Sequence, residues 1–285
     1  MEHVSTRTRR RRIERISATG DGPAGAKADL LAVEEPLEIR IGGQALTVTM
    51  RTPGDDLDLA AGFLFTEGLL SPAVDLRQIR MCDENVADAT LGPPDLPAPA
   101  ALERATDTRR AQRNFLTTSA CGVCGKESID AIRVRSRYDL ATDRVRVSSS
   151  VLASLPDRLR EAQRVFASTG GLHAAGLFGA DGTLLVLRED VGRHNAVDKV
   201  IGWALRAGRL PLTGHVLLVS GRASFELVQK AAVAGIPVLA AVSAPSSLAA
   251  DLADETGMTL VGFLRGSSMN AYAGVERITA VPASA

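Results

Sequence analysis

Apolar and polar side chains alternate over residues 37–50, which is the pattern of half-buried β-strands. Gly42 and Gly43 interrupt this alternation, so we predict a β-hairpin there. A helical spacing of apolar side chains follows over residues 57–64 and ends near Gly68. We therefore expect the first part of the chain to form a small α+β unit.

The second half of the chain instead contains short apolar runs without alternation, as in strands that are covered on both faces. These runs are residues 184–187, 215–220, 237–242 and 258–264. Helical patterns precede or separate them, over residues 156–168, 195–208, 224–234 and 246–256. The alternation of strands and helices predicts a layered α/β sandwich with a substantially parallel central sheet.

The chain divides by composition into three predicted segments. They are a disordered basic tail over residues 1–28, a smaller α+β domain over residues 29–150 and an α/β domain over residues 151–285. The tail joins a cluster of arginines to a Gly/Ala/Pro run and lacks the apolar segment of a secretion signal. Residues 92–101 are expected to form a surface loop, and residues 133–147 have a strand-like pattern.

Composition narrows the class of protein. Hydrophobic residues make up 45% and charged residues 23% of the 285 residues, as in a globular domain. The 33 basic and 33 acidic side chains cancel, which argues against nucleic acid or an anionic membrane as a partner. No apolar run is long enough to span a bilayer. The three cysteines, an odd and small number, fit a reducing compartment, so we expect a cytoplasmic protein.

The candidate chemistry begins at Cys121 and Cys124, which lie among small residues. The glycines that follow each cysteine favour a mobile loop. Lys126 is a nearby cation that favours the thiolate, so both cysteines are candidate nucleophiles. A structural zinc site is an alternative, although only Cys82 and four histidines are left to complete it. Thioredoxin-like redox exchange is another alternative.

Polar loops follow the predicted strands of the second domain, where α/β sheets gather ligands. These loops are residues 189–195, 220–224, 243–246 and 265–268. Their glycines, helix N-termini, Arg222 and Arg265 suit phosphate, although none matches the P-loop or the dinucleotide fingerprint. Taken singly, each loop is explained by helix capping. His173 and His194 are candidate acid/base groups or structural histidines.

Six motifs occur in a fixed order between Glu35 and Tyr272. They are Glu35-Pro36-Leu37, Met50-Arg51-Thr52-Pro53-Gly54-Asp55-Asp56, Cys121-Gly122-Val123-Cys124-Gly125, Thr169-Gly170-Gly171-Leu172-His173-Ala174-Ala175, Glu189-Asp190-Val191-Gly192-Arg193-His194-Asn195-Ala196-Val197-Asp198-Lys199 and Ser243-Ala244-Pro245-Ser246-Ser247. Together they resemble the formate dehydrogenase accessory sulfurtransferase family, FdhD. The deaminase zinc signature, His-x-Glu followed by Pro-Cys-x-x-Cys, does not occur, so deamination is not expected.

This resemblance implies a cytoplasmic sulfurtransferase that accepts persulfide sulfur from a cysteine desulfurase. It passes the sulfur to the molybdenum bis-guanine-dinucleotide cofactor, which formate dehydrogenase needs for activity. The persulfide would form on Cys121, with Cys124 as the second cysteine of the pair. The resemblance also implies a homodimer and a second domain similar to the cytidine deaminase fold. The implied cofactor-binding residues are Phe263, Leu264, Arg265, Gly266, Ser267 and Ser268.

For the guanine nucleotide, Phe263 or a neighbouring apolar residue is a candidate base platform and Arg265 a candidate phosphate ligand, with Arg222 and Ser246 as further candidates. GDP or GTP should then bind without molybdenum. The competing function is a zinc-stabilised binding module that acts as a chaperone for a molybdoenzyme, without sulfur chemistry.

Overall fold

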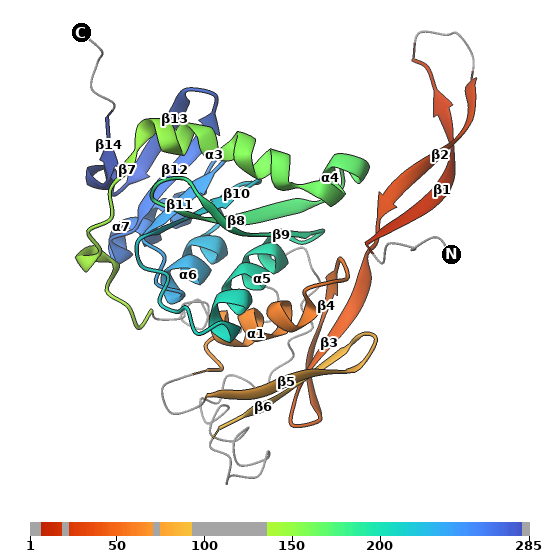
Figure 1. The fold of residues 1–285 in the computed structure, drawn as a ribbon, viewed down its shortest axis with the longest axis horizontal. Helices are drawn as coiled ribbons and strands as arrows, with labels where there is room; N and C mark the ends of the chain where they lie inside the picture. The colour runs from red at the N-terminus through yellow and green to blue at the C-terminus, as the bar shows by residue number, and fades with distance from the viewer. Residues whose placement is uncertain (1–6, 19–22, 71–74, 93–135, 281–285) are drawn as a thin grey trace.

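The computed structural model describes residues 7–18, 23–70, 75–92 and 136–280. Two sheets form the body of the molecule, and a separate β-hairpin projects from it (Figure 1). None of the helices in these ranges is long and apolar enough to cross a bilayer.

The smaller sheet has four strands in the order β4-β3-β6-β5. They are β3 (Glu35–Ile41), β4 (Gln44–Arg51), β5 (Leu76–Asp83) and β6 (Val86–Leu91). Strands β3 and β4 form the predicted hairpin, and the helix predicted after it is α1 (Asp56–Thr66). Leu37, Ile39 and Ile41 are buried at alternate positions of β3 and join α1 in one core. The α+β unit predicted from the alternation is confirmed.

The larger sheet has six strands in the order β13-β12-β11-β10-β8-β9. They are β8 (His173–Gly179), β9 (Leu184–Asp190), β10 (His215–Val219), β11 (Val238–Ala241), β12 (Thr259–Arg265) and β13 (Ser268–Ala273). Of the five neighbouring pairs, only β10–β11 and β11–β12 are parallel, and the other three are antiparallel. The sheet is therefore mixed, because the tight turns after β8 and β12 make antiparallel hairpins with β9 and β13.

Helices cover both faces of this sheet (Figure 1). They are α3 (Ser149–Ala162), α4 (Arg164–Thr169), α5 (Arg193–Arg206), α6 (Phe225–Val233) and α7 (Ser247–Thr256). Leu217 of β10 lies in the core that contains α5, α6 and α7, whereas its neighbours Val216 and Leu218 lie in the core that contains α3. The result is a three-layer α/β sandwich. Its likeness to the cytidine deaminase fold stays a prediction.

Two of the predicted elements are wrong. The helix expected over residues 156–168 begins at Ser149, where Ser148 caps it, and breaks at Gln163 into α3 and α4. Strand-like residues were predicted over 133–147, of which 133–135 lie outside the described residues. Of residues 136–147, only Val147 is in a strand, in the short parallel pair β7 (Val147–Ser148) and β14 (Ile278–Thr279). Residues 136–146 are otherwise irregular, apart from one 3-10 turn at Leu140–Thr142. A second 3-10 turn, at Val275–Arg277, precedes β14.

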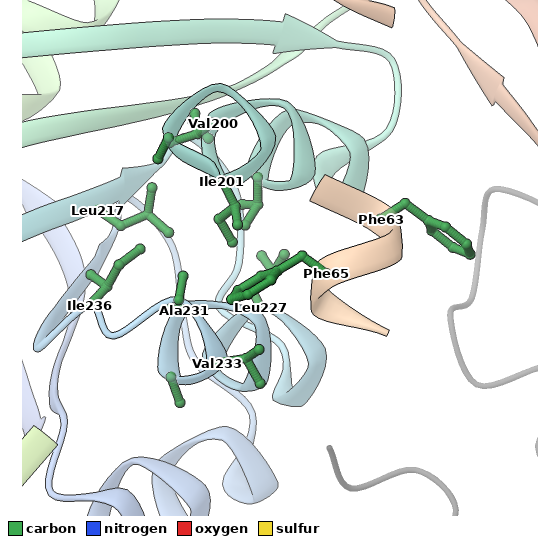
Figure 2. Close-up of a cluster of buried hydrophobic side chains, with 14 of the residues drawn as sticks. Phe63, Phe65, Val200, Ile201, Leu217, Leu227, Ala231, Val233 and Ile236 are labelled. Carbon is green, nitrogen blue, oxygen red and sulfur yellow. The ribbon is translucent and has the colours of Figure 1, made fainter. Parts of the chain in front are cut away.

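Helices α1 and α5 join the two parts of the molecule, and they touch through glycine. A Cβ atom at Gly62 would lie 1.9 Å from the carbonyl oxygen of Asp198, and one at Gly202 would lie 1.8 Å from that of Asp58. Phe65 of α1 points towards α6, beside the core side chains of α5 (Figure 2). One continuous core therefore spans both sheets. The predicted boundary at residue 150 falls inside α3, and division into two domains stays a prediction.

A buried ion pair lies at this junction. The Lys230 ammonium donates to both carboxylate oxygens of Asp198, at 2.9 and 3.0 Å, and to the Thr66 hydroxyl at 2.8 Å. Burial acts to lower the pKa of Lys230, but Asp198 and Glu67 outweigh it and raise the pKa. Side chains from α1, α5 and α6 thus satisfy one another in a buried position.

The basic segment at the start of the chain is not a disordered tail in the part described. Strands β1 (Thr8–Ile16) and β2 (Pro23–Ala32) form an antiparallel hairpin. Its base is held because the Arg7 guanidinium contacts Asp55 at 2.7 Å and the Val33 N–H donates to the Arg7 carbonyl at 2.9 Å. Pairing of the backbone along the two strands overrides the polar composition that predicted disorder.

Candidate functional site

The candidate site lies at one edge of the six-stranded sheet. Strands β10, β11 and β12 end there because they are parallel, and β8 begins there because it runs antiparallel to β10. The Ala174 N–H donates to the Ser220 hydroxyl at 2.9 Å, and the Ser246 N–H donates to the Ala223 carbonyl at 3.0 Å. The Phe263 N–H donates to the Ser243 carbonyl at 3.2 Å. These bonds bring the predicted loops 220–224 and 243–246 together beside the end of β12.

The segment 263–268 leaves β12 through an irregular turn. Phe263 has a φ of +50°, a left-handed conformation that is uncommon for a side chain of this size. A bulge between Gly262 and Arg265 accompanies it. Phe263 is 38% exposed, and the Arg265 guanidinium lies 5.9 Å from the centre of its ring. Backbone strain of this kind occurs at ligand sites more often than elsewhere.

The six predicted cofactor-binding residues are not equivalent. Leu264 is fully buried in the core beneath α3, so its side chain anchors the turn. Phe263, Arg265, Gly266, Ser267 and Ser268 are exposed. Arg265 also donates from Nε to the Val242 carbonyl at 3.4 Å, which holds its side chain over the neighbouring loop.

His194, at the N-terminus of α5, meets Glu226 and Ser224 of the next helix. The His194 Nε2 and Glu226 Oε2 atoms are 2.9 Å apart, and the Ser224 hydroxyl donates to the same oxygen at 3.2 Å. The bond to His194 holds the pKa of Glu226 below its ordinary value. Serine and carboxylate contact the same histidine nitrogen, whereas a nucleophilic triad uses both nitrogens. The trio therefore fits a hydrogen-bonded cluster at the edge rather than a nucleophilic triad.

His173 begins β8, and in the β8–β9 ladder its backbone lies opposite that of Asp190 at the end of β9. Partial burial, followed by the nearby charges of Arg193 and His194, lowers its pKa below the ordinary value. This lowering of the pKa favours the neutral form of the His173 ring. A neutral ring among cations can accept a hydrogen bond at this edge.

A buried pair that the sequence did not predict secures the neighbouring loop. The Lys199 ammonium lies 2.7 Å from the Asp190 carboxylate and donates to the Thr52 carbonyl at 2.8 Å. The Thr52 N–H donates to Asp190 at 3.1 Å. Thr52 lies far from Asp190 in the sequence, so only the fold brings them together. Glu226 was missed for the same reason.

The two predicted nucleophiles, Cys121 and Cys124, lie outside the described residues. Cys82 is described, is exposed on β5 and has a free thiol. In the described ranges, no three Cys, His, Asp or Glu side chains gather closely enough to hold a metal ion.

Comparison with known sequences decides the relationship. A sequence profile of the FdhD/NarQ family matches residues 32–279, which is most of the chain. The chain belongs to the FdhD/NarQ family.

Curated members of the FdhD/NarQ family resemble the chain over nearly its full length. The sulfur carrier protein FdhD of Mycolicibacterium paratuberculosis is 58% identical over 95% of this chain and 98% of its own. That of Streptomyces coelicolor is 58% identical over 95% of each chain. A crystal structure from Desulfotalea psychrophila, of a protein assigned as a formate dehydrogenase accessory protein, has a TM-score of 0.73 at 25% identity. It covers 95% of this chain and 99% of the other.

Proposed function

We propose that the protein is a cytoplasmic sulfur carrier that serves formate dehydrogenase maturation. The observation that carries the proposal is its identity of 58%, over almost the whole chain, to proteins named as sulfur carriers. The donor is a cysteine desulfurase, and the acceptor is the molybdenum bis-guanine-dinucleotide cofactor. The protein acts as a homodimer.

Sulfur transfer needs a thiolate and little else from the protein. The Cys121 thiolate attacks the outer sulfur of the donor persulfide, so a new sulfur–sulfur bond forms on Cys121. The donor's own sulfur–sulfur bond breaks, and its cysteine leaves as a thiolate. No external oxidant or reductant is needed in this step. Cys124 is the second thiol of the pair and either resolves or relays the persulfide.

The sheet edge is the proposed site for the guanine-dinucleotide part of the acceptor, which is a substrate. An exposed aromatic ring at Phe263 offers a surface for the base, and the Arg265 guanidinium beside it offers charge for the pyrophosphate. Ser246 caps α7 at this edge, so the N–H groups of that helix face the same side. GDP and GTP carry the same base and pyrophosphate and are the natural surrogates.

The direct test is mass spectrometry of the protein after incubation with a cysteine desulfurase and cysteine. We expect the peptide that contains Cys121 to gain about 32 Da, the mass of one sulfur atom in a persulfide. Omission of cysteine is the control, and the Cys82 peptide should stay unmodified. Stoichiometric zinc with an unmodified Cys121 would instead indicate the zinc-stabilised chaperone.

A second test concerns Arg265. Removal of a charged phosphate contact costs roughly 1.5–3 kcal/mol, so Arg265→Ala should weaken GDP binding about tenfold to more than a hundredfold. Calorimetry with GDP measures this change. Arg144→Ala, which removes another exposed arginine away from the edge, is the matched control and should bind as the wild type does. Equal affinities for the wild type and Arg265→Ala would contradict the proposed location.

A further inference from the structure

The β1–β2 hairpin concentrates positive charge on a chain that has none overall. Five arginines and one lysine in the two strands stand against one glutamate and one aspartate, which gives the hairpin a net charge of +4. Because the whole chain has a formal net charge of zero, the remainder carries −4. Such a separation of charge produces a positive electrostatic potential around the hairpin, which attracts acidic surfaces.

Both faces of the hairpin are open to solvent. Side chains alternate between the faces, so Arg9 and Arg11 share one face with Leu31, and Arg10 and Arg12 occupy the other. All four arginines are exposed. An isolated two-stranded ribbon has no core of its own and is at best marginally stable. The ribbon stands away from the two sheets (Figure 1). Its side chains are therefore free to contact another molecule.

The base of the hairpin is fixed close to the candidate site. Arg7 is ion-paired with Asp55, and Asp55 also lies 3.5 Å from Arg188 of β9. The same loop reaches the sheet edge through the hydrogen bond from Thr52 to Asp190. A partner bound along the ribbon is thereby held next to the loop that begins α5.

We infer that the β1–β2 hairpin is a docking surface for an acidic patch on a partner protein. Arginine pairs with carboxylates through two parallel hydrogen bonds and is enriched in protein interfaces. Apolar side chains accompany the charge, since Ile16 is 83% and Leu31 is 41% exposed. This surface needs neither Cys121 nor the nucleotide site, so it does not depend on the proposed function.

Two features favour a protein over a nucleic acid or a membrane. Glu14 and Asp29 lie among the arginines, and Asp29 is directly opposite Arg11. The body beyond the hairpin has a net charge of −4 and would repel a polyanion that extends past the ribbon. A compact acidic patch meets only the ribbon and avoids this repulsion.

The test is fluorescence anisotropy with a short labelled oligoglutamate peptide, which is compact enough to contact the hairpin alone, and the full-length protein, at low and at physiological salt. Arg10→Glu/Arg12→Glu should weaken binding by more than about tenfold, because two attractive pairs become repulsive. Arg10→Gln/Arg12→Gln should give an intermediate loss. Arg144→Glu/Arg146→Glu makes the same change in net charge on exposed residues outside the hairpin and should bind nearly as the wild type does.

Several outcomes would overturn the inference. An equal loss in the Arg144→Glu/Arg146→Glu control would mean that only net charge matters. Tighter binding of a DNA duplex, or of phosphatidylglycerol vesicles, that the hairpin substitutions abolish would assign the surface to nucleic acid or membrane. A change in the sedimentation of the isolated protein caused by these substitutions would assign it to a second copy of the chain. Thermal unfolding of each variant verifies that it is folded.

Discussion

Cells in which Cys121→Ala replaces the wild-type protein are expected to have no detectable formate dehydrogenase activity. Alanine has no sulfur atom on which to accept the donor's outer sulfur, so the covalent intermediate cannot form. The loss should be complete, because the proposal places the carried sulfur on Cys121 and gives Cys124 only the second step. Formate oxidation by extracts of a deletion strain that carries each variant measures it, with an immunoblot to equalise the amounts of protein.

Cys82→Ala is the matched control for this experiment. Its thiol is free and exposed on β5, so its removal should leave formate dehydrogenase activity unchanged. Cys124→Ala distinguishes the two roles proposed for Cys124. A relay cysteine is required for delivery of the sulfur to the acceptor. A resolving cysteine is not required for the loading of sulfur onto Cys121. Wild-type activity in Cys121→Ala would contradict the proposed carrier mechanism.

Gly202→Ala is expected to destabilise the protein by about 3 kcal/mol or more. Its Cβ atom would lie 1.8 Å from the Asp58 carbonyl oxygen and 2.6 Å from the Gly62 nitrogen. Both obstacles are backbone atoms, so α1 and α5 have to separate. An exposed helical glycine would behave in the opposite way, because alanine favours a helix by about 1 kcal/mol. The midpoint of urea unfolding measures the change.

Gly171→Ala is the control, because the nearest atom to its new Cβ would be that of Ala32 at an ordinary 3.6 Å. Gly62→Ala should resemble Gly202→Ala, since its Cβ would lie 1.9 Å from the Asp198 carbonyl oxygen. The double substitution should destabilise the protein by less than the sum of the two single losses of stability, because one separation of the helices relieves both clashes. An unchanged midpoint of urea unfolding in Gly202→Ala would show that the two helices adjust to the new methyl group without loss of stability.

Local patterns predicted much of the fold because they reflect burial on one or both faces of an element. The alternation in β3 and the runs of β10 and β12 are examples, and each matches a strand within about a residue or two at its ends. The direction of a strand is not encoded in such a run. The sheet was therefore expected to be more parallel than it is, since β8 and β13 run antiparallel to β10 and β12.

The site was predictable to a lesser extent. Loops at strand ends can be found from the sequence, and they converge as expected. Contacts between distant segments cannot be found in this way. His194 and Glu226 illustrate the limit, because they are separated by a helix and a strand. Phe263 is exposed beside the buried Leu264 because its backbone has a left-handed conformation, which no sequence pattern predicted.

The glycine contact between α1 and α5 has a consequence for synthesis on the ribosome. Residues 56–66 leave the ribosome well before residues 193–206, yet each helix buries its apolar face against the other. Contacts between such distant segments form late and slowly. Helix α1 and the sheet beneath it therefore emerge with their shared core uncovered. The nascent chain is most prone to aggregate during that interval and most in need of a chaperone.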